Sequence, residues 1–370
     1  MEKNTTNKID PLIIEKSQNK SGIKIKTLKE QGIKDFAFDM DGTLVDDKGR
    51  ILEGVIDNFQ AILSDVSDAK ISIVTASTPN IIQIFIENVN KEFKERGIEF
   101  KFKPYIASCL GARIEDTDGK LLLNKTLTPS LVQDIANRIN IVEENKFLLY
   151  VVKDANYYNL DVLNSKEKVM MPILKIMQAK KGYAKFEANA INTADLDKII
   201  NNNEILGLYI LGLSSESVKE IHNAIKTLDL HGSYVDKGSV VKVTNSNKLN
   251  AIKFIYGDDL SKVVYVGDGR NDIDALKACG NSVAVGSNVE VLKSAQFPLI
   301  QIKNVYDTMT SSMMKKQATK DNLPNKIIEA EKINNEILEH NQKKYYIKNN
   351  VNCENQKISR KFKARKFKIN

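Results

Sequence analysis

Two pairs of aspartates lie in short glycine-containing loops, and each loop follows an apolar stretch typical of a buried strand. Asp39 and Asp41 lie in the sequence DMDGTL, and Asp268 and Asp272 lie in the sequence GDGRND. A plain Asp-Gly turn is the alternative for either loop, because this dipeptide is common in turns. A turn does not explain a second aspartate two residues away, nor a strand that leads directly into the pair. The pattern therefore indicates a functional site.

The apolar segments 36–38 and 263–266 bring the four carboxylates together if their strands are parallel, because parallel strands share a carboxyl edge. Four carboxylates at close range cannot all ionise unless a divalent cation offsets their repulsion. Oxygen ligands without His or Cys favour Mg²⁺ over zinc. The sequence therefore predicts a Mg²⁺ site with room for a phosphate.

These residue types can also transfer a phosphoryl group. One carboxylate can attack phosphorus to form an aspartyl-phosphate, while its partner two residues on acts as general acid and then general base. Thr75, at the end of the strand-like segment 70–74, offers a hydroxyl and adjacent backbone N–H groups. Lys248, at the start of a predicted helix, offers a positive charge to phosphate. An ordinary surface lysine is the alternative for Lys248, because lysine is abundant in this chain.

Strands alternate with helices in two separate parts of the chain, 31–80 and 244–305. This alternation predicts an α/β core with a Rossmann-like parallel sheet. Residues 81–243 have shorter strands, a hairpin signal and further helices, typical of an α+β domain inserted into the core. We expect residues 1–30 to form a flexible arm and residues 306–370 to form a basic extension, partly helical or disordered.

The composition is that of a globular protein in a reducing compartment. The 370 residues can form two domains, with 42% hydrophobic and 28% charged residues. No apolar run approaches a membrane span, and the first residues lack the apolar core of a signal peptide. The three cysteines are widely spaced and form no metal or redox motif. We therefore expect a cytoplasmic protein.

The net charge of +8 resides in the C-terminal extension. Residues 301–370 contain 16 basic and 7 acidic side chains, whereas the other 300 residues contain 39 and 40. The last part, RKFKARKFK at 360–368, interleaves two Phe with basic residues. A disordered, solubilising tail is one interpretation. Contact with nucleic acid or an anionic membrane is the other.

The motifs and their order resemble those of the haloacid dehalogenase (HAD) superfamily. The features that carry the resemblance are DMDGTL, the strand-end Thr75, the helix-opening Lys248 and GDGRND. Only about 36 residues separate Asp39 from Thr75, so the insert lies between the second and third motifs. This arrangement resembles the Cof-type (IIB) phosphatase subfamily, and segment 105–114 resembles the opening of its cap domain. The resemblance covers about residues 33–300.

The resemblance implies a Mg²⁺-dependent phosphatase acting on small phosphorylated metabolites such as sugar phosphates. Asp39 would be the nucleophile and Asp41 the general acid/base. The Mg²⁺ ligands would be Asp39, the Asp41 carbonyl and Asp268, with Asp272 bound directly or one layer further out. The residues that bind phosphate would be Thr75, Ala76, Lys248 and Asn271. The cap would close over the leaving group, exclude water and set specificity.

The sequence departs from the family pattern at four positions. Ala76 and Ser77 replace the common Gly-Arg after the motif threonine, and Leu110 replaces an Asn at the cap entrance. Leu249 replaces the Gly that usually follows the motif lysine. The changes at the first two sites remove polar or charged groups expected near substrate, so a hexose-phosphate preference does not follow from the resemblance. The four carboxylates are intact, so we expect catalytic competence.

Two alternative functions remain from the sequence. A phosphosugar mutase of the same fold would need basic cap residues for a second phosphate, and no compact arginine set is present there. A catalytically weak protein of this fold could instead bind RNA or membrane through its basic tail. Deletion of residues 306–370 distinguishes a phosphatase from such a binder, since a phosphatase should retain activity whereas a tail-driven binder should lose its partner.

Overall fold

The computed structural model describes the parts of the chain that form two β-sheets. It describes residues 28–142, 147–153, 156–159, 188–202, 204–211, 220–221, 223–225, 227–228, 232–236 and 240–299. Nearly all of the expected arm, the basic extension, a helix expected within 166–180 and most of one expected at 215–228 lie outside these residues. Contacts of the extension with nucleic acid or membrane stay predictions. Within the described ranges, no helix has the length and apolarity needed to cross a membrane.

The larger sheet has eight strands in the order β14-β13-β12-β1-β2-β3-β4-β5. The strands are β1 (Asp35–Phe38), β2 (Lys70–Val74), β3 (Tyr105–Ser108), β4 (Arg113–Glu115), β5 (Leu121–Asn124), β12 (Val263–Gly267), β13 (Asn281–Val285) and β14 (Phe297–Leu299). The strands from β14 to β3 run parallel, whereas β4 and β5 are antiparallel to their neighbours. The predicted parallel α/β sheet is confirmed, with β1 between β12 and β2.

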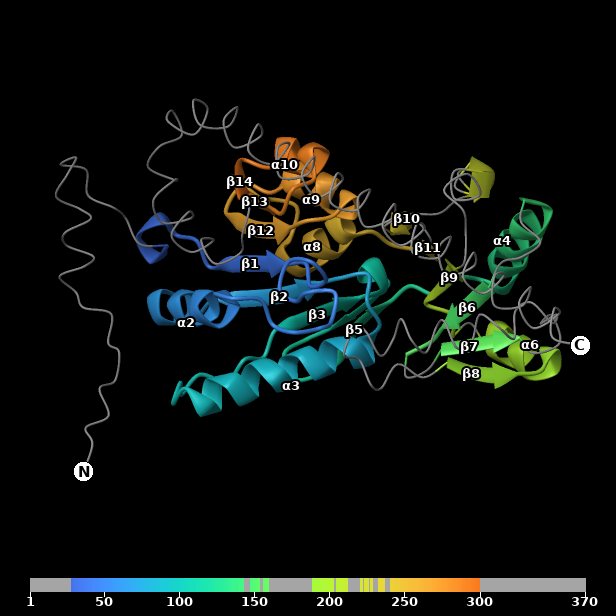
Figure 1. Cartoon of the computed structure of the whole chain (residues 1–370), viewed down its shortest axis with the longest axis horizontal. Helices are drawn as coiled ribbons and strands as arrows, with labels where there is room; N and C mark the ends of the chain where they lie inside the picture. The colour runs from blue at the N-terminus through green and yellow to red at the C-terminus, as the bar shows by residue number, and fades with distance from the viewer. Residues whose placement is uncertain are drawn as a thin grey trace, which may run out of the picture.

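Helices cover both faces of the larger sheet (Figure 1). The helices of this part are α2 (Val55–Asp65), α3 (Pro79–Glu95), α8 (Lys248–Tyr256), α9 (Ile273–Ala278) and α10 (Val289–Ser294), with 3₁₀ turns η1 (Lys29–Gln31), η2 (Cys109–Gly111) and η3 (Arg270–Asp272). Phe36 and Phe38 of β1 pack with α2 and α3, whereas Ala37 packs with α8, α9 and α10. Alternate residues of a strand point to opposite faces, so β1 is buried on both.

The second sheet has six strands in the order β10-β11-β9-β6-β7-β8. Its elements are α4 (Pro129–Val142), β6 (Phe147–Val151), β7 (Asn156–Asn159), β8 (Ala188–Ile191), α6 (Thr193–Asn201), β9 (Gly207–Leu211), β10 (Gly232–Asp236) and β11 (Val240–Thr244). All its pairings are antiparallel except β7 with β8. The sheet lies beside the larger one in Figure 1 and has a separate apolar core against α4 and α6.

The sheet topology differs from the expected start of the inserted domain at residue 81. α3 packs on the larger sheet, and β3 pairs in parallel with β2 through Ser72–Val74. The hairpin of β4 and β5 continues that sheet, so the second sheet begins only with β6. The short apolar stretches in segment 105–124 resemble the start of a new domain. Their strands instead form one edge of the larger sheet. The elements β7, β8, α6, α10 and β14 were not predicted, since each is short and most have little apolar periodicity.

Local sequence explains where two helices near the sheet edge begin. α3 begins at Pro79, where the missing N–H would have had no helical partner. Its apolar side chains recur every three or four residues and face the core, as predicted. α8 begins after Asn247, whose side chain accepts the N–H of Asn250 at 2.8 Å. This N-cap makes Lys248 the first residue of α8.

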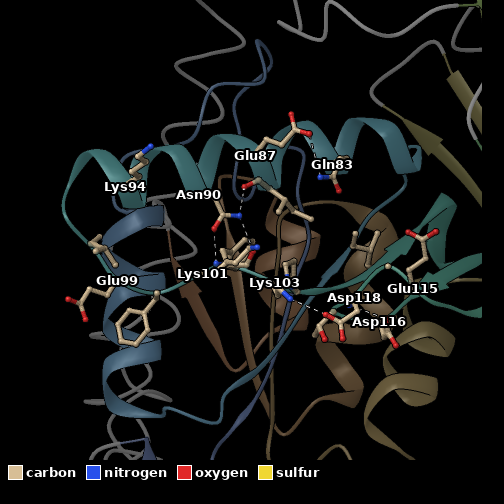
Figure 2. Close-up of a pocket in the computed structure, with 18 of the residues that line it drawn as sticks. Gln83, Glu87, Asn90, Lys94, Glu99, Lys101, Lys103, Glu115, Asp116 and Asp118 are labelled. Carbon is tan, nitrogen blue, oxygen red and sulfur yellow. Dashed lines mark hydrogen bonds and ion pairs between the residues drawn. The ribbon is translucent and has the colours of Figure 1, made fainter.

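A groove with a volume of about 940 Å³ lies between α3, the segment 97–104 and the turn 115–119 (Figure 2). Lys103 and Asp118, at 3.0 Å, form an ion pair at this groove. Its lining carries both positive and negative side chains. The register pairs Ile106 with Glu115 here, two residues before the carboxyl end of β3. The groove therefore opens toward the amino-terminal end of β3, away from the predicted carboxylates.

The Phe102 ring joins α2, α3 and the segment that precedes β3. It stacks on Phe59 with a 4.6 Å centroid separation and meets Phe85 and Phe93 edge-on at 6.2 and 6.5 Å. We expect Phe102→Ala to lower the free energy of unfolding by about 3–5 kcal/mol, because truncation of a buried aromatic leaves a cavity. Urea denaturation measures this change.

The matched control is Phe100→Ala, two residues away. Phe100 is 39% exposed, whereas Phe102 is 2% exposed. The control should change the free energy of unfolding by no more than about 0.5 kcal/mol. Equal losses for the two variants would contradict the assignment of Phe102 to the core.

Candidate active site

The carboxyl edge of the larger sheet collects residues singled out by the sequence. Asp39 follows β1, Thr75 follows β2 and Asp268 follows β12, and these three parallel strands are adjacent. The N–H of Asp39 donates to the Val266 carbonyl at 2.8 Å, so strand pairing continues to the aspartate itself. The backbone position of Asp39 is therefore fixed by the sheet.

Three of the four predicted carboxylates form a cluster. Asp39, Asp268 and Asp272 each place one oxygen within 4.8 Å of the others. Asp39 and Asp272 are buried, and Asp268 is partly exposed. Asp41 also follows β1 but is held by a different partner, Ser77, whose hydroxyl donates to Asp41 Oδ2 at 2.5 Å. The structure thus separates one carboxylate, Asp41, from the three that cluster.

The carboxylate of Asp272 is surrounded by four donors. Its Oδ2 accepts the backbone N–H groups of Asp268 and Gly269 at 3.0 and 2.8 Å. Its Oδ1 accepts the Tyr265 hydroxyl and the Lys248 ammonium, each at 2.5 Å. A carboxylate has about four acceptor positions. Since these contacts occupy them, Asp272 is built to orient its neighbours rather than to ligate a metal directly.

Lys248 is a buried cation between two carboxylates. Its Nζ lies 2.6 Å from Asp39 Oδ1 and 2.5 Å from Asp272 Oδ1. The residue is 1% exposed, so the interpretation as an ordinary surface lysine is wrong. One ammonium group faces three clustered carboxylates, and the cluster keeps a surplus of negative charge.

Burial and charge set the protonation of this cluster. Burial raises the pKa of Asp39 well above its usual value, and the charges of Asp272 and Asp268 add to this effect against Lys248. Burial alone would lower the pKa of Lys248, but the charges of Asp272 and Asp39 outweigh it and raise that pKa. Burial and the charge of Asp272 also raise the pKa of Tyr265. Lys248 therefore stays positive and Tyr265 stays a hydroxyl donor.

The donor set suits a Mg²⁺ ion. Asp39 and Asp268 offer carboxylate oxygens, and the Asp41 carbonyl follows on the same loop. No His or Cys belongs to the cluster found in the described part of the chain. Hard oxygen ligands favour Mg²⁺, and a divalent cation would offset the repulsion that raises the pKa of Asp39. The residues present therefore fit the ion that the sequence predicts.

Two glycines allow the motif loops to approach each other closely. Gly42 has a φ of 89°, and a Cβ placed there would lie 2.2 Å from Asp268 Oδ2. A Cβ on Gly267 would lie 2.5 Å from Asp272 Cγ. Beside Gly42, the Thr43 hydroxyl donates to Asp268 Oδ1 at 3.1 Å. The glycines of DMDGTL and GDGRND are thus required by space around the carboxylates.

The loop 75–78 follows β2 and is almost fully buried. The Thr75 hydroxyl accepts the N–H of Ser77 at 3.1 Å, and both residues are at most 8% exposed. Ala76 is 6% exposed and accepts the Tyr209 hydroxyl of the second sheet on its carbonyl at 2.5 Å. Asn271 lies in η3, directly before Asp272, and is partly exposed. All four predicted phosphate-binding residues therefore lie near the ends of strands or the starts of helices at this edge.

Sequence reasoning did not assign roles to Thr43, Ser77, Tyr209 or Tyr265. Tyr265 could have been suspected, since it is the one polar side chain in an otherwise apolar strand, VVYVG. Ser77 was noted as a departure from the family pattern, but nothing local indicated its bond to Asp41. Tyr209 belongs to a different sheet, 133 residues from its partner Ala76, and no local signal could have found the contact.

A comparison with models of protein families identifies the family of the chain. The model of the haloacid dehalogenase-like hydrolases matches residues 36–304, and the chain belongs to this family. No match was found among curated proteins.

Solved structures of similar fold belong to the same superfamily. A haloacid dehalogenase-like hydrolase from B. subtilis has a TM-score of 0.60 at 20% identity, over 75% of this chain and 99% of that one. A HAD/COF-like hydrolase from Plasmodium vivax has a TM-score of 0.58 at 20% identity, over 76% and 95%. A HAD subclass IIB sugar phosphatase has a TM-score of 0.53 at 20% identity, over 77% and 98%. The likeness to these structures concerns the fold, which is that of Cof-type members.

We expect Asp39→Asn to stabilise the metal-free protein at pH 7–8. The raised pKa of Asp39 means that the native state binds this proton more tightly than the unfolded chain does. The ionised carboxylate therefore costs stability above its raised pKa, and that cost vanishes as pH falls toward the unfolded value of about 3.9. Urea denaturation in EDTA should show a higher midpoint for the variant, with a difference that shrinks toward pH 4.

The matched control is Asp47→Asn in an exposed turn, which should leave the midpoint unchanged. A lower midpoint for Asp39→Asn than for wild type would contradict the assignment of surplus negative charge to the cluster.

We expect Gly42→Ala to weaken Mg²⁺ binding by at least about tenfold. The new Cβ would displace the Asp268 side chain, and mutation of residues that position metal ligands changes metal affinity by about this factor or more. Isothermal titration calorimetry measures the change. Gly119→Ala is the matched control, since Gly119 has a similar φ of 80° but no atom within 4 Å of the added Cβ. If both variants bind Mg²⁺ equally, the close approach of Gly42 to Asp268 has no role in the metal site.

Proposed function

We propose that the chain is a Mg²⁺-dependent phosphatase that hydrolyses phosphate monoesters of small metabolites through an aspartyl-phosphate. The observation that carries the proposal is the contact of Lys248 with Asp39. A carboxylate at the end of the central strand is paired with a buried ammonium and lies beside Asp268. A second carboxylate, Asp41, lies two residues away with its own partner. This arrangement supports a nucleophile and a separate acid/base.

In the first step, an oxygen of Asp39 forms a bond to phosphorus as the bond to the leaving oxygen breaks. Asp41 gives its proton to that leaving oxygen. In the second step, Asp41 takes a proton from water as the water oxygen bonds to phosphorus and the bond between phosphorus and Asp39 breaks, so inorganic phosphate leaves and the Asp39 carboxylate is regenerated. Asp41 regains in the second step the proton that it gave in the first, so water is the one reactant consumed besides the ester.

The remaining residues supply fixed charge and donors. Lys248 offsets the negative charge at Asp39, and Asp272, which itself accepts the Tyr265 hydroxyl, holds Lys248 in place. The loop 75–78 and Asn271 would contact the phosphoryl oxygens. Mg²⁺, held by Asp39, the Asp41 carbonyl and Asp268, would neutralise charge on the transferring phosphoryl group.

The substrate class is a small phosphate monoester, such as a sugar phosphate. The second sheet lies close enough to touch the site loop through Tyr209, which supports its role as a cap over the leaving group. One solved structure of similar fold is described as a sugar phosphatase. Leu110 and Ser77 replace polar or charged residues near that leaving group, so this chain's preference among sugar phosphates follows from its own cap. Its cytoplasmic location stays a prediction from the sequence.

The test is phosphate release from a panel of phosphorylated metabolites, with Mg²⁺ and with EDTA. We expect Mg²⁺-dependent turnover that falls by at least about 10³-fold in Asp39→Asn, since a nucleophile has no substitute in a two-step mechanism. Asp47→Asn, in the exposed turn, should match wild type. Absence of turnover with every substrate, in a folded protein that binds Mg²⁺, would overturn the proposal.

A further inference from the structure

Ser77 occupies a position between the proposed acid/base and the loop that follows β2. Its hydroxyl donates to Asp41 Oδ2 at 2.5 Å, and its own N–H donates to the Thr75 hydroxyl at 3.1 Å. Ser77 is 8% exposed, so water does not compete freely for this hydroxyl. Ser77 therefore holds one oxygen of the Asp41 carboxyl group in a fixed direction from the buried loop.

The backbone of the loop 75–78 is pinned at three successive carbonyls. The carbonyl of Thr75 accepts the N–H of Leu110 at 2.8 Å, and that of Ser77 accepts the N–H of Cys109 at 2.9 Å. Cys109 and Leu110 reach these carbonyls with positive φ values of 49° and 59°, a conformation that costs energy for side chains other than Gly. The core itself therefore fixes the loop on both sides of Ala76.

The middle carbonyl is bound from the second sheet. Tyr209, on β9, donates its hydroxyl to the Ala76 carbonyl at 2.5 Å and is 6% exposed. The ammonium of Lys242, opposite Tyr209 on β11, lies 5.2 Å from the centre of its ring. The Cys109 thiol lies within hydrogen-bond reach of Tyr209 as well. A rigid, buried tyrosine thus joins the cap sheet to the loop that carries Ser77.

We propose that Ser77 and Tyr209 are positioning residues for Asp41: Ser77 orients the carboxyl group, and Tyr209 fixes the loop from the cap. The proposal rests on the phosphatase function above, in which Asp41 is the general acid. Its consequence is that placement of the acid depends on contact between cap and core. The hydrogen-bonded path runs from the Tyr209 hydroxyl through the Ala76 and Ser77 backbone to Asp41.

The dependence of the reaction rate on the leaving group of the substrate tests this role. When the bond between phosphorus and an alkyl oxygen breaks, that oxygen must take the proton from Asp41. When 2,4-dinitrophenyl phosphate reacts, the phenolate departs without a proton. Loss of acid placement therefore slows transfer of the phosphoryl group to Asp39 from the alkyl ester and spares transfer from the dinitrophenyl ester. The later attack of water, in which Asp41 is the base, is common to both substrates and affects kcat but not kcat/KM. Damage to Asp39, Lys248 or the metal site slows the transfer from both esters.

The experiment measures kcat and KM of wild type, Ser77→Ala, Ser77→Thr and Tyr209→Phe with Mg²⁺ on two substrates. One is 2,4-dinitrophenyl phosphate and the other is the sugar phosphate that wild type hydrolyses fastest. Ser77→Ala should lower kcat/KM on the sugar phosphate by about 30–100-fold, up to the lower end of the range that general acid catalysis supplies. On 2,4-dinitrophenyl phosphate it should lower kcat/KM by less than about threefold.

The conservative variants extend the test. Ser77→Thr keeps the hydroxyl and should recover most of the kcat/KM on the sugar phosphate that Ser77→Ala loses. Tyr209→Phe should show the same dependence on leaving group with a smaller loss of about 3–10-fold, because two carbonyl contacts still hold the loop. Controls are Ser72→Ala, a buried serine of β2 outside the site, and Tyr150→Phe, a buried tyrosine of β6 in the core of the second sheet. Both should retain wild-type kcat on each substrate.

The outcomes separate the two proposals. Equal losses of kcat/KM on both substrates, or none, for a folded Ser77→Ala would overturn the positioning role while the phosphatase function stands. A Tyr209→Phe protein that behaves like Tyr150→Phe would remove the cap from the path. If wild type hydrolyses neither substrate, the phosphatase function fails, and if it hydrolyses only the dinitrophenyl ester, the acid role of Asp41 fails with the inference.

Discussion

The ammonium of Lys248, buried between Asp39 and Asp272, is the interaction on which the site depends. Without it, the buried carboxylates of Asp39 and Asp272 would lose the cation they share, and burial of a charge without its partner is costly. Its position follows from a chain of simpler causes. Asn247 caps α8, the cap fixes the first helical residue, and burial of the α8 face against the sheet turns that residue inward. Tyr265 and two backbone N–H groups complete the shell of Asp272, which in turn holds the lysine. A catalytic charge is thereby built from ordinary elements of an α/β fold.

The core sheet and its carboxylate edge could be predicted from the sequence because both rest on local pattern. The strands β1, β2 and β12 are apolar on both faces, as central parallel strands must be, and each ends in a polar loop. The convergence of Asp39, Asp268 and Asp272 follows from topology alone. The edge of the sheet was harder to predict. β3 and β4 are short and resemble the start of a new domain, and only hydrogen bonding to β2 shows which sheet they complete. Ser77 and Tyr209 could not be predicted, since their roles arise from contacts between loops and between sheets.

The four carboxylates of the motifs have different surroundings, and their environments separate their uses. Asp272 is saturated by four donors and serves as a support. Asp39 and Asp268 lie beside it, and burial raises the pKa of Asp39 against the charge of Lys248. The carboxylate of Asp41 accepts the Ser77 hydroxyl. The same residue type therefore has different surroundings at one sheet edge, and its chemistry there depends on its neighbours as well as on its identity.

The parallel pairing of β1 with β12 also has a consequence for how the chain is made. The two strands are separated by more than two hundred residues, and every residue of β1 pairs with one of β12. β1 is synthesised long before β12. Until β12 is made, the backbone N–H and C=O groups on that side of β1 have no strand to pair with. Lys248, the partner of the Asp39 carboxylate, is also synthesised about two hundred residues after Asp39. Contacts of such long sequence separation form slowly, so the late part of the chain both closes the sheet and neutralises the site. Completion of the sheet around β1 and pairing of Asp39 with Lys248 thus both require the late part of the chain.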